Sequence, residues 1–273
     1  MSQAGSETMT VIPHSPAWYD RLAQEQVGYY YPWQSLLPPL HGEDLFLQMV
    51  KQHVSPELDV LEVACAHGEL TLALAPLCRS ILGYDRVAAW IERAQSAAAQ
   101  HGFTNARFAC HNSSSEANGG QPRLPALADS FDLLICSKGP FHWIEDARRV
   151  ARSNAVLLML VPDSTPLPTW HSQLPVSLQW QAYSDPHWAK PAIEQRLAVG
   201  GLELDSWWSF DVPEIFPNPE QLYVHLSWGK TISQIPTFIE VRPILDHIFH
   251  AYGSDEGVAI RRFRYIWKAI ATK

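Results

Sequence analysis

Strand-like and helix-like segments alternate from residue 59 to residue 161. Short apolar runs typical of strands lie at 59–64, 80–84, 105–110, 131–136 and 155–161, and runs with helical periodicity lie between them at 69–77, 87–101 and 143–151. Strands joined by helical crossovers of this length form a parallel sheet that helices cover on both faces. The chain is therefore expected to adopt an α/β fold.

The segment that follows this alternation has a different composition. Residues 162–191 are rich in proline and aromatic residues. Proline excludes long helices and aromatic side chains need a packing partner, so we expect an insertion that packs on the sheet edge or over a pocket. Further helices are expected at about 42–54, 188–199, 218–226 and 236–251, and further strands at 202–210 and 258–268.

Length and charge narrow the functional classes. A chain of 273 residues with 47% hydrophobic residues can bury a sizeable core in one domain with appendages. The net charge of −8, without a broad basic cluster, argues against a nucleic-acid partner. No apolar run approaches the roughly 20 residues of a membrane span, so we expect a cytoplasmic protein without a membrane partner.

The cysteine and histidine spacing argues against a structural metal. None of the 4 cysteines belongs to a CxxC pair, which predicts buried thiols rather than disulfides or zinc ligands. His247 and His250 share a helix face, but no third ligand is spaced to complete a site. We therefore expect no metal.

The turn after the first predicted strand reads Ala64-Cys65-Ala66-His67-Gly68, and the second strand ends at Asp85. In open parallel sheets, ligands bind outside the carboxyl ends of the strands, where the N–H groups of such a turn lie. A carboxylate roughly 20 residues beyond the turn is placed to accept both hydroxyls of a ribose. A dinucleotide fingerprint needs a small residue at its sixth position, where this chain has Glu69, so a dinucleotide is disfavoured.

Small residues at 64, 66 and 68, preceded by Glu62, resemble the first motif of class I S-adenosylmethionine-dependent methyltransferases. The resemblance extends over roughly residues 17–161 and more weakly to the end of the chain. It implies a Rossmann-like, doubly wound, mostly parallel seven-stranded sheet with helices on both faces, an antiparallel last strand and an N-terminal helical lid. It also implies S-adenosylmethionine as the cofactor and S-adenosylhomocysteine as the product.

The resemblance assigns roles to individual residues. Glu62 would organise the loop and the amino-acid end of the cofactor, and Asp85 would bind the ribose. Asn112 stands where the family often has an aspartate near the adenine amino group, and its amide oxygen can still accept a hydrogen bond. The cofactor-binding residues predicted in this way are Glu62, Ala64, Cys65, Ala66, His67, Gly68, Asp85, Arg86, His111, Asn112, Cys136 and Ser137.

The chain departs from the family pattern at two kinds of turn. Alanines occupy positions 64 and 66, where the motif has glycines, and a methyl group at 66 costs ~1 kcal/mol if the backbone there needs a positive φ. Before the fifth strand, Asn154 replaces a usual glycine. Asparagine tolerates the left-handed conformation, so we expect that turn to survive.

Methyl transfer is an in-line displacement that needs no covalent enzyme intermediate, so positioning can supply most of the acceleration. His142, in the turn after the fourth predicted strand, is the candidate general base, with packing at a helix start as the alternative. Aromatic residues of the lid and after residue 165 indicate a pocket for a flat or apolar molecule, with core packing as the alternative. The predicted substrate-binding residues are Tyr19, Tyr30, Trp33, Lys138, Trp143, Tyr223 and Trp228.

The sequence therefore predicts methyl transfer to a small aromatic or heterocyclic metabolite by a monomer or homodimer. The alternatives are an RNA or protein methyltransferase of the same fold and a non-catalytic, cofactor-binding regulatory domain. The predicted organisation is a single domain over 1–273 that comprises a tail and lid (1–40), a cofactor-binding core (41–161), a substrate-cap insertion with a strand (162–235) and a closing helix and strand (236–273).

Overall fold

The computed structural model describes residues 14–163, 166–180 and 187–273. These residues form two compact units. Unit 1 contains the described parts of Met1–Ser35, Thr169–Trp180 and Phe216–Val258, and unit 2 contains those of Leu36–Pro168, Gln181–Ile215 and Ala259–Lys273. The tail predicted at 1–12 lies outside the described residues, and the domain boundaries expected near 40, 161 and 235 remain predictions.

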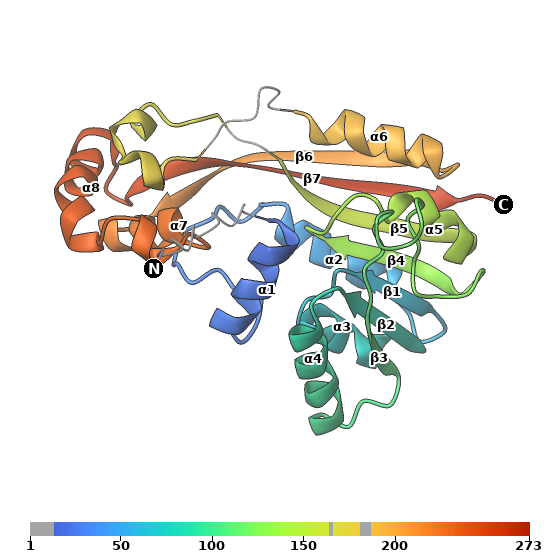
Figure 1. Cartoon of the computed structure of the whole chain (residues 1–273). Coiled ribbons are helices and arrows are strands. Elements are labelled where there is room, and N and C mark those ends of the chain that lie inside the picture. Colours follow the sequence, from blue (N-terminus) through green and yellow to red (C-terminus); the bar gives the residue numbers. More distant parts are fainter. Residues whose placement is uncertain (1–13, 164–165, 181–186) are drawn as a thin grey trace, which may run out of the picture. The chain divides into compact units, whose positions relative to one another are not determined.

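A seven-stranded sheet with the order β3-β2-β1-β4-β5-β7-β6 forms the centre of unit 2 (Figure 1). Its strands are β1 (Asp59–Val63), β2 (Ser80–Asp85), β3 (Ala106–Cys110), β4 (Phe131–Ser137), β5 (Ala151–Asp163), β6 (Glu203–Phe216) and β7 (Val258–Ala271). The first five strands pair in parallel, and β7 runs antiparallel to β5. The predicted fold class is confirmed, and the strand order reverses at β1, where ligands of such sheets bind.

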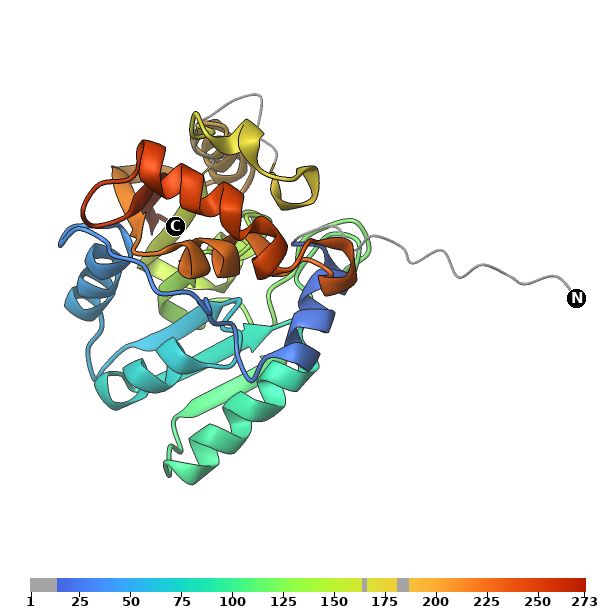
Figure 2. The same ribbon diagram turned by 90° about the vertical axis from the view of Figure 1, so that its left-hand side faces the viewer.

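Helices cover both faces of this sheet. The helices of unit 2 are α2 (Glu43–His53), α3 (Glu69–Leu74) with a 3₁₀ turn at Ala75–Leu77, α4 (Ala88–Gln100), α5 (Ile144–Val150) and α6 (Ala189–Val199). One core cluster joins the sheet to α5 and α6, and another joins it to α2 and the end of α3. α4 lies along β3 in both views (Figure 2). Among the residues described, no helix has the length and apolar character needed to cross a membrane.

Unit 1 is built from helices and short turns. Its helices are α1 (Pro16–Glu25), α7 (Pro219–Ser227) and α8 (Phe238–Tyr252), with 3₁₀ turns at His171–Gln173, Val176–Leu178 and Ile232–Gln234. The indole of Trp18 on α1 donates to Gly229 O at 2.8 Å. The ammonium of Lys230 donates to Ser177 O at 2.6 Å and to Gln179 O at 3.0 Å. These contacts bring segments far apart in sequence into one unit.

Small differences from the predicted elements have local causes. β5 begins at Ala151 rather than at residue 155. Ala151 pairs with Phe131 of β4, and the register of the two strands shifts between Phe131 and Leu133. Asn154 lies in this segment with φ of +66°, the left-handed conformation expected of it. The cysteines are free, but Cys110 is exposed, so the prediction of a buried thiol is wrong there, because β3 is the edge strand of the sheet.

Candidate functional site

The turn at 64–68 is tied to the end of β2 by backbone and side-chain hydrogen bonds. Cys65 N donates to Tyr84 O at 3.0 Å, and Ala66 N donates to Asp85 Oδ2 at 3.0 Å. Within the turn, Gly68 N donates to Cys65 O at 2.8 Å. The structure therefore brings the predicted loop and the predicted carboxylate into direct contact.

The backbone of this turn is left-handed at alternate residues. The φ angles are +56° at Ala64, +47° at Ala66 and +82° at Gly68. A Cβ at Gly68 would lie 2.6 Å from Phe108 Cε1 and 2.8 Å from Ala94 Cβ, so this position excludes a side chain. At 64 and 66 the chain tolerates a methyl group at the cost of about 1–2 kcal/mol per left-handed L-residue. The alanines that replace glycine at these two positions therefore strain the backbone of the turn.

Relieving this strain gives a measurable result. We expect Ala66→Gly to raise the free energy of unfolding by about 1 kcal/mol, because glycine adopts the left-handed conformation without cost, less the extra chain entropy that it loses on folding. The matched control is Ala99→Gly at an exposed position of α4, which should lower the free energy of unfolding by about 0.5–1 kcal/mol. Urea unfolding measures the free energy of unfolding of both variants. If Ala66→Gly were destabilised as much as Ala99→Gly, the backbone at Ala66 would not be strained.

Asp85 is buried at the end of β2, with 7% of its surface exposed. Its two carboxylate oxygens accept from Ala66 N at 3.0 Å and from Val87 N at 2.9 Å. Burial raises the pKa of Asp85 above its ordinary value, while the hydrogen bonds from Val87 and Ala66 oppose that rise. An ionised carboxylate has about four lone-pair sites, so it can still accept from a ribose hydroxyl while it holds the turn.

Glu62 is buried in β1, with 4% of its surface exposed. Its Oε2 accepts a hydrogen bond from the hydroxyl of Thr71, in the first turns of α3, which fastens the helix to the strand. Burial raises the pKa of Glu62 to about 8, although the hydrogen bonds from Thr71 favour the ionised form. Thr71 was not predicted from the sequence, since a single threonine in a helix carries no signal for such a contact.

The raised pKa of Glu62 predicts a pH-dependent stability. The folded chain holds this proton up to about pH 8, whereas an unfolded glutamate loses it near pH 4.5. The free energy of unfolding should therefore fall as pH rises from about 4.5 to about 8, by on the order of 5 kcal/mol at most. Glu62→Gln should remove this fall while keeping an acceptor for Thr71. Urea unfolding from pH 5 to 8 measures the free energy of unfolding of the wild type and of Glu62→Gln. If it fell equally with pH in both proteins, Glu62 would not be the group responsible.

The thiols near the turn are not nucleophiles. Cys65 and Cys136 are buried, and burial raises the pKa of both thiols well above the ordinary value. The side chain of Cys136 packs beneath Gly139, where a Cβ would lie 2.6 Å from its sulfur. Ser137, the last residue of β4, is partly exposed. Of these predicted cofactor residues, Cys136 presents no side-chain surface to a ligand because its sulfur is enclosed.

The residues after β3 are held by local hydrogen bonds. Asn112 is exposed, and its Oδ1 accepts from Ser114 N at 3.1 Å. The Nε2 of His111 pairs with Arg123 O at 2.7 Å, and His111 N donates to Asp85 O at 2.9 Å. Both predicted residues therefore lie at the same edge of the sheet as the turn.

A chain of hydrogen bonds connects His142 to two residues that the sequence did not single out. His142 Nε2 lies 2.9 Å from Ser113 Oγ, which lies 3.0 Å from the hydroxyl of Tyr84. Burial lowers the pKa of His142, with the positive charge of Arg196 adding to this effect. Ser113 is one of a run of serines, so the sequence offered no means to choose it.

Five predicted substrate-binding residues belong to unit 1: Tyr19, Tyr30, Trp33, Tyr223 and Trp228. There, Trp33 and Trp228 lie with ring centroids 5.6 Å apart, and the hydroxyl of Tyr223 donates to Pro236 O at 2.9 Å. Their contact with a substrate remains a prediction.

The other two substrate-binding predictions, Lys138 and Trp143, belong to unit 2. Lys138 bends the chain after β4 with φ of +61°, and its N–H donates to Leu160 O at 2.9 Å. Trp143 is fully buried in the core and stacks on Trp267 at 6.0 Å. The prediction that Trp143 contacts substrate is therefore corrected, because its large apolar ring fills the space between α5 and the sheet.

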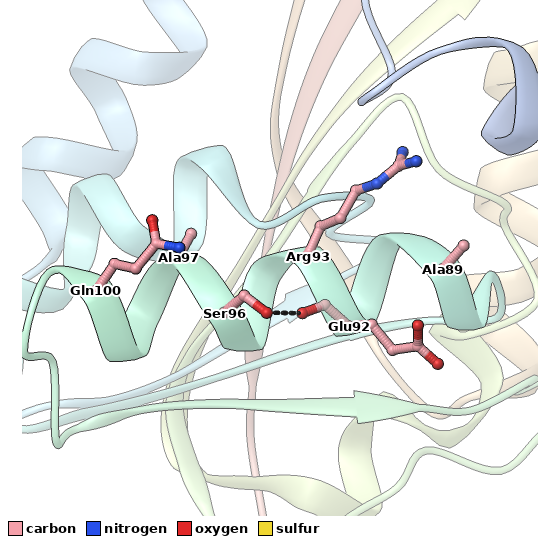
Figure 3. Close-up of a pocket in the computed structure, with 6 residues that line it drawn as sticks. All are labelled: Ala89, Glu92, Arg93, Ser96, Ala97 and Gln100. Atoms are coloured by element: carbon pink, nitrogen blue, oxygen red, sulfur yellow. Dashed lines mark hydrogen bonds between the residues drawn. The ribbon is translucent and has the colours of Figure 1, made fainter.

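Two surface hollows lie on the described part of unit 2. One, of about 460 Å³, is lined by residues of α4 alone, whose side chains spread along one side of the helix (Figure 3). The other, of about 450 Å³, lies against α6, β6 and β7, and its lining includes His187, Lys190, Trp207, Asp211, Phe263 and Tyr265. Neither contains a predicted cofactor residue. Within the described ranges, no group of three or more metal-ligating side chains is present.

Comparisons with known proteins agree with this geometry. Residues 60–163 match the model of a family described as "Methyltransferase domain". No curated protein matches the chain. A functionally unknown protein from Deinococcus radiodurans R1 is similar in structure, with 21% identity, a TM-score of 0.64, and coverage of 92% of this chain and 97% of that one.

Two further solved structures share the fold at low identity. The YcgJ protein from Bacillus subtilis has 17% identity and a TM-score of 0.53, with 84% of this chain and 99% of that one covered. The cyclase SpnF has 14% identity and a TM-score of 0.55, with 94% and 92% covered. The family match, the strand order and the turn fixed by Asp85 lead to one conclusion. Residues 60–163 match a methyltransferase domain, and the sheet around them has the Rossmann-like strand order expected of such a domain.

Proposed function

We propose that this chain transfers the methyl group of S-adenosylmethionine to a small aromatic or heterocyclic metabolite. The observation that carries the proposal is the turn at 64–68, which Asp85 holds through Ala66 N at 3.0 Å while keeping acceptor capacity for a ribose. The methyltransferase-domain match over residues 60–163 supports the same activity.

The chain's contribution to this reaction is placement. S-adenosylmethionine supplies a methyl group on a positively charged sulfur, and an in-line acceptor needs no enzyme nucleophile. That requirement fits a site whose nearest thiols, Cys65 and Cys136, stay protonated. Asp85 would fix the ribose, and the N–H groups of the turn would fix the rest of the cofactor.

Charge and aromatic content support a small acceptor over RNA. The net charge of −8 gives no general attraction to phosphates. In unit 1, Trp228 has its ring centroid 5.1 to 5.7 Å from those of Trp18, Tyr29, Tyr31 and Trp33. Such rings bind flat or cationic molecules through their faces. A cytoplasmic monomer or homodimer is part of the same proposal.

Calorimetry with S-adenosylmethionine and S-adenosylhomocysteine tests the cofactor site first, and we expect both to bind. Methyl-labelled cofactor is then offered with phenols, indoles, quinolines and aromatic amines, and in parallel with RNA and with peptides. Transfer of the label to a small molecule supports the proposal. Transfer to RNA or to a peptide would show that the methyl acceptor is a macromolecule instead. SpnF, named as a cyclase, shares the fold, so binding without transfer would indicate a role other than methylation.

A further inference from the structure

Three side chains connect the segments at the carboxyl ends of β2, β3 and β4. Tyr84 lies at the end of β2, Ser113 follows β3 and His142 follows β4. The hydroxyls of Tyr84 and Ser113 are 3.0 Å apart, and Ser113 Oγ is 2.9 Å from His142 Nε2. Tyr84 is 2% exposed and Ser113 3% exposed, so water does not compete for these contacts.

Burial gives this chain of hydrogen bonds a direction. Among the described residues, the hydroxyl of Tyr84 has Ser113 Oγ as its hydrogen-bond partner. If Tyr84 accepted from Ser113, its own hydrogen would be buried without an acceptor, which is costly. Burial also raises the pKa of Tyr84 well above its ordinary value, so the phenol keeps its proton. Tyr84 therefore donates to Ser113, and the hydrogen of Ser113 points to His142 Nε2.

This direction fixes the tautomer of His142. A ring nitrogen that accepts from Ser113 carries no proton, so a neutral imidazole carries its proton on Nδ1. The charged groups that face His142 from other segments are Arg196 on α6 and Glu116 after β3. Burial first, and then Arg196, lower the pKa of His142, while Glu116 raises it; the net direction is downward. His142 is only partly buried and its Nε2 is taken by Ser113, so a ligand would bind at Nδ1.

We propose that Tyr84 and Ser113 are positioning residues that make His142 a hydrogen-bond donor through Nδ1–H, in place of the general base considered from the sequence. A ligand atom that accepts this bond is an unprotonated ring nitrogen or a carbonyl oxygen, borne either by the adenine of the cofactor or by the methyl acceptor. The ligand's identity rests on the proposed function, whereas the tautomer does not.

The tautomer is tested first on the ligand-free protein. Nitrogen-15 spectra of labelled histidines should show His142 protonated on Nδ1 and neutral at pH 7. Ser113→Ala and Tyr84→Phe should each convert this signal to a mixture of tautomers, and Ser113→Thr should restore it. Ser96→Ala, whose hydroxyl donates to Glu92 O on exposed α4, is the control without an expected change. Protonation of His142 on Nε2 in the wild type, or an unchanged signal in both folded variants, would overturn the proposal.

The ligand is tested with His142→Phe. If the acceptor atom belongs to adenine, the Kd for S-adenosylhomocysteine rises about tenfold, as for one lost hydrogen bond. If the acceptor atom belongs to the methyl acceptor, the Kd for S-adenosylhomocysteine is unchanged. In that case kcat/KM falls about tenfold for whichever of the tested small molecules the chain methylates. Whichever of these two quantities changes in His142→Phe should also change in Ser113→Ala, but by a smaller factor. Ser113→Thr should restore its wild-type value. Unchanged values of both quantities in His142→Phe overturn the donor role, whereas failure of the cofactor to bind wild type rejects the proposed function alone.

Discussion

The Asp85→Asn variant is expected to bind S-adenosylhomocysteine at least about a hundredfold more weakly than the wild-type chain. In the proposed cofactor site, the carboxylate would accept two charge-assisted hydrogen bonds from ribose hydroxyls, of about 1.5–3 kcal/mol each. An asparagine at 85 would also turn an NH₂ group toward Ala66 N or Val87 N, where the wild type has an acceptor at 3.0 or 2.9 Å. The turn at 64–68 would therefore lose its anchor together with its ligand.

Calorimetry measures this loss, and circular dichroism establishes that the variant is folded. The matched control is Asp246→Asn, an exposed carboxylate on α8 that pairs with Arg242 at 3.5 Å. Its affinity for S-adenosylhomocysteine should equal that of the wild type. If folded Asp85→Asn bound within twofold of wild type, the ribose assignment would be wrong.

Glu43→Gln is expected to lower the free energy of unfolding by about 3 kcal/mol, the low end of the range for removing one partner of a buried ion pair. Glu43, at the start of α2, accepts from Arg262 and, at 3.0 Å, from Arg264 on β7. Arg262 also contacts Glu214 at 3.1 Å. The arginine side chains are 9% and 13% exposed and that of Glu43 is 20% exposed, so water cannot fully replace the lost charge.

Urea unfolding at pH 7 measures this effect against Glu194→Gln. Glu194 pairs with Lys190 at 2.9 Å on α6, but both side chains are nearly half exposed, so its loss should cost less than about 1 kcal/mol. Arg264 and Arg262 lower the pKa of Glu43 to about 2 against the effect of burial. Its contribution is therefore present above pH 4.5 and is lost as pH falls toward 2. Similar losses in both variants would show that the network at Glu43 is no stronger than a surface pair.

Local periodicity was sufficient to predict the helices and strands of unit 2. Each strand between 59 and 161 has an apolar run of its own, and each crossover has a helical repeat, so neighbouring residues hold the information. The turn at 64–68 and Asp85 were found for the same reason, because their spacing is set by one strand, one helix and the next strand. The positive φ at Asn154, near the start of β5, was likewise a property of one residue type.

Other features depend on contacts between distant segments. The bond from Thr71 to Glu62, the chain from Tyr84 through Ser113 to His142, and the buried arginines around Glu43 each join elements that are adjacent only in the folded sheet. Trp143 illustrates the opposite case. Its position after β4 indicated a ligand contact, but the packing of α5 on the sheet buries it against Trp267.

The sequence by itself determined the succession of strands and helices along the chain and the turn at 64–68 beside Asp85, because hydrophobic period and turn spacing act over a few neighbouring residues. The tertiary structure alone decided which polar groups are buried together, and therefore the protonation of Glu62, the depressed pKa of Glu43 and the orientation of His142. Burial and hydrogen-bond direction are properties of the assembled sheet, so no segment encodes them alone.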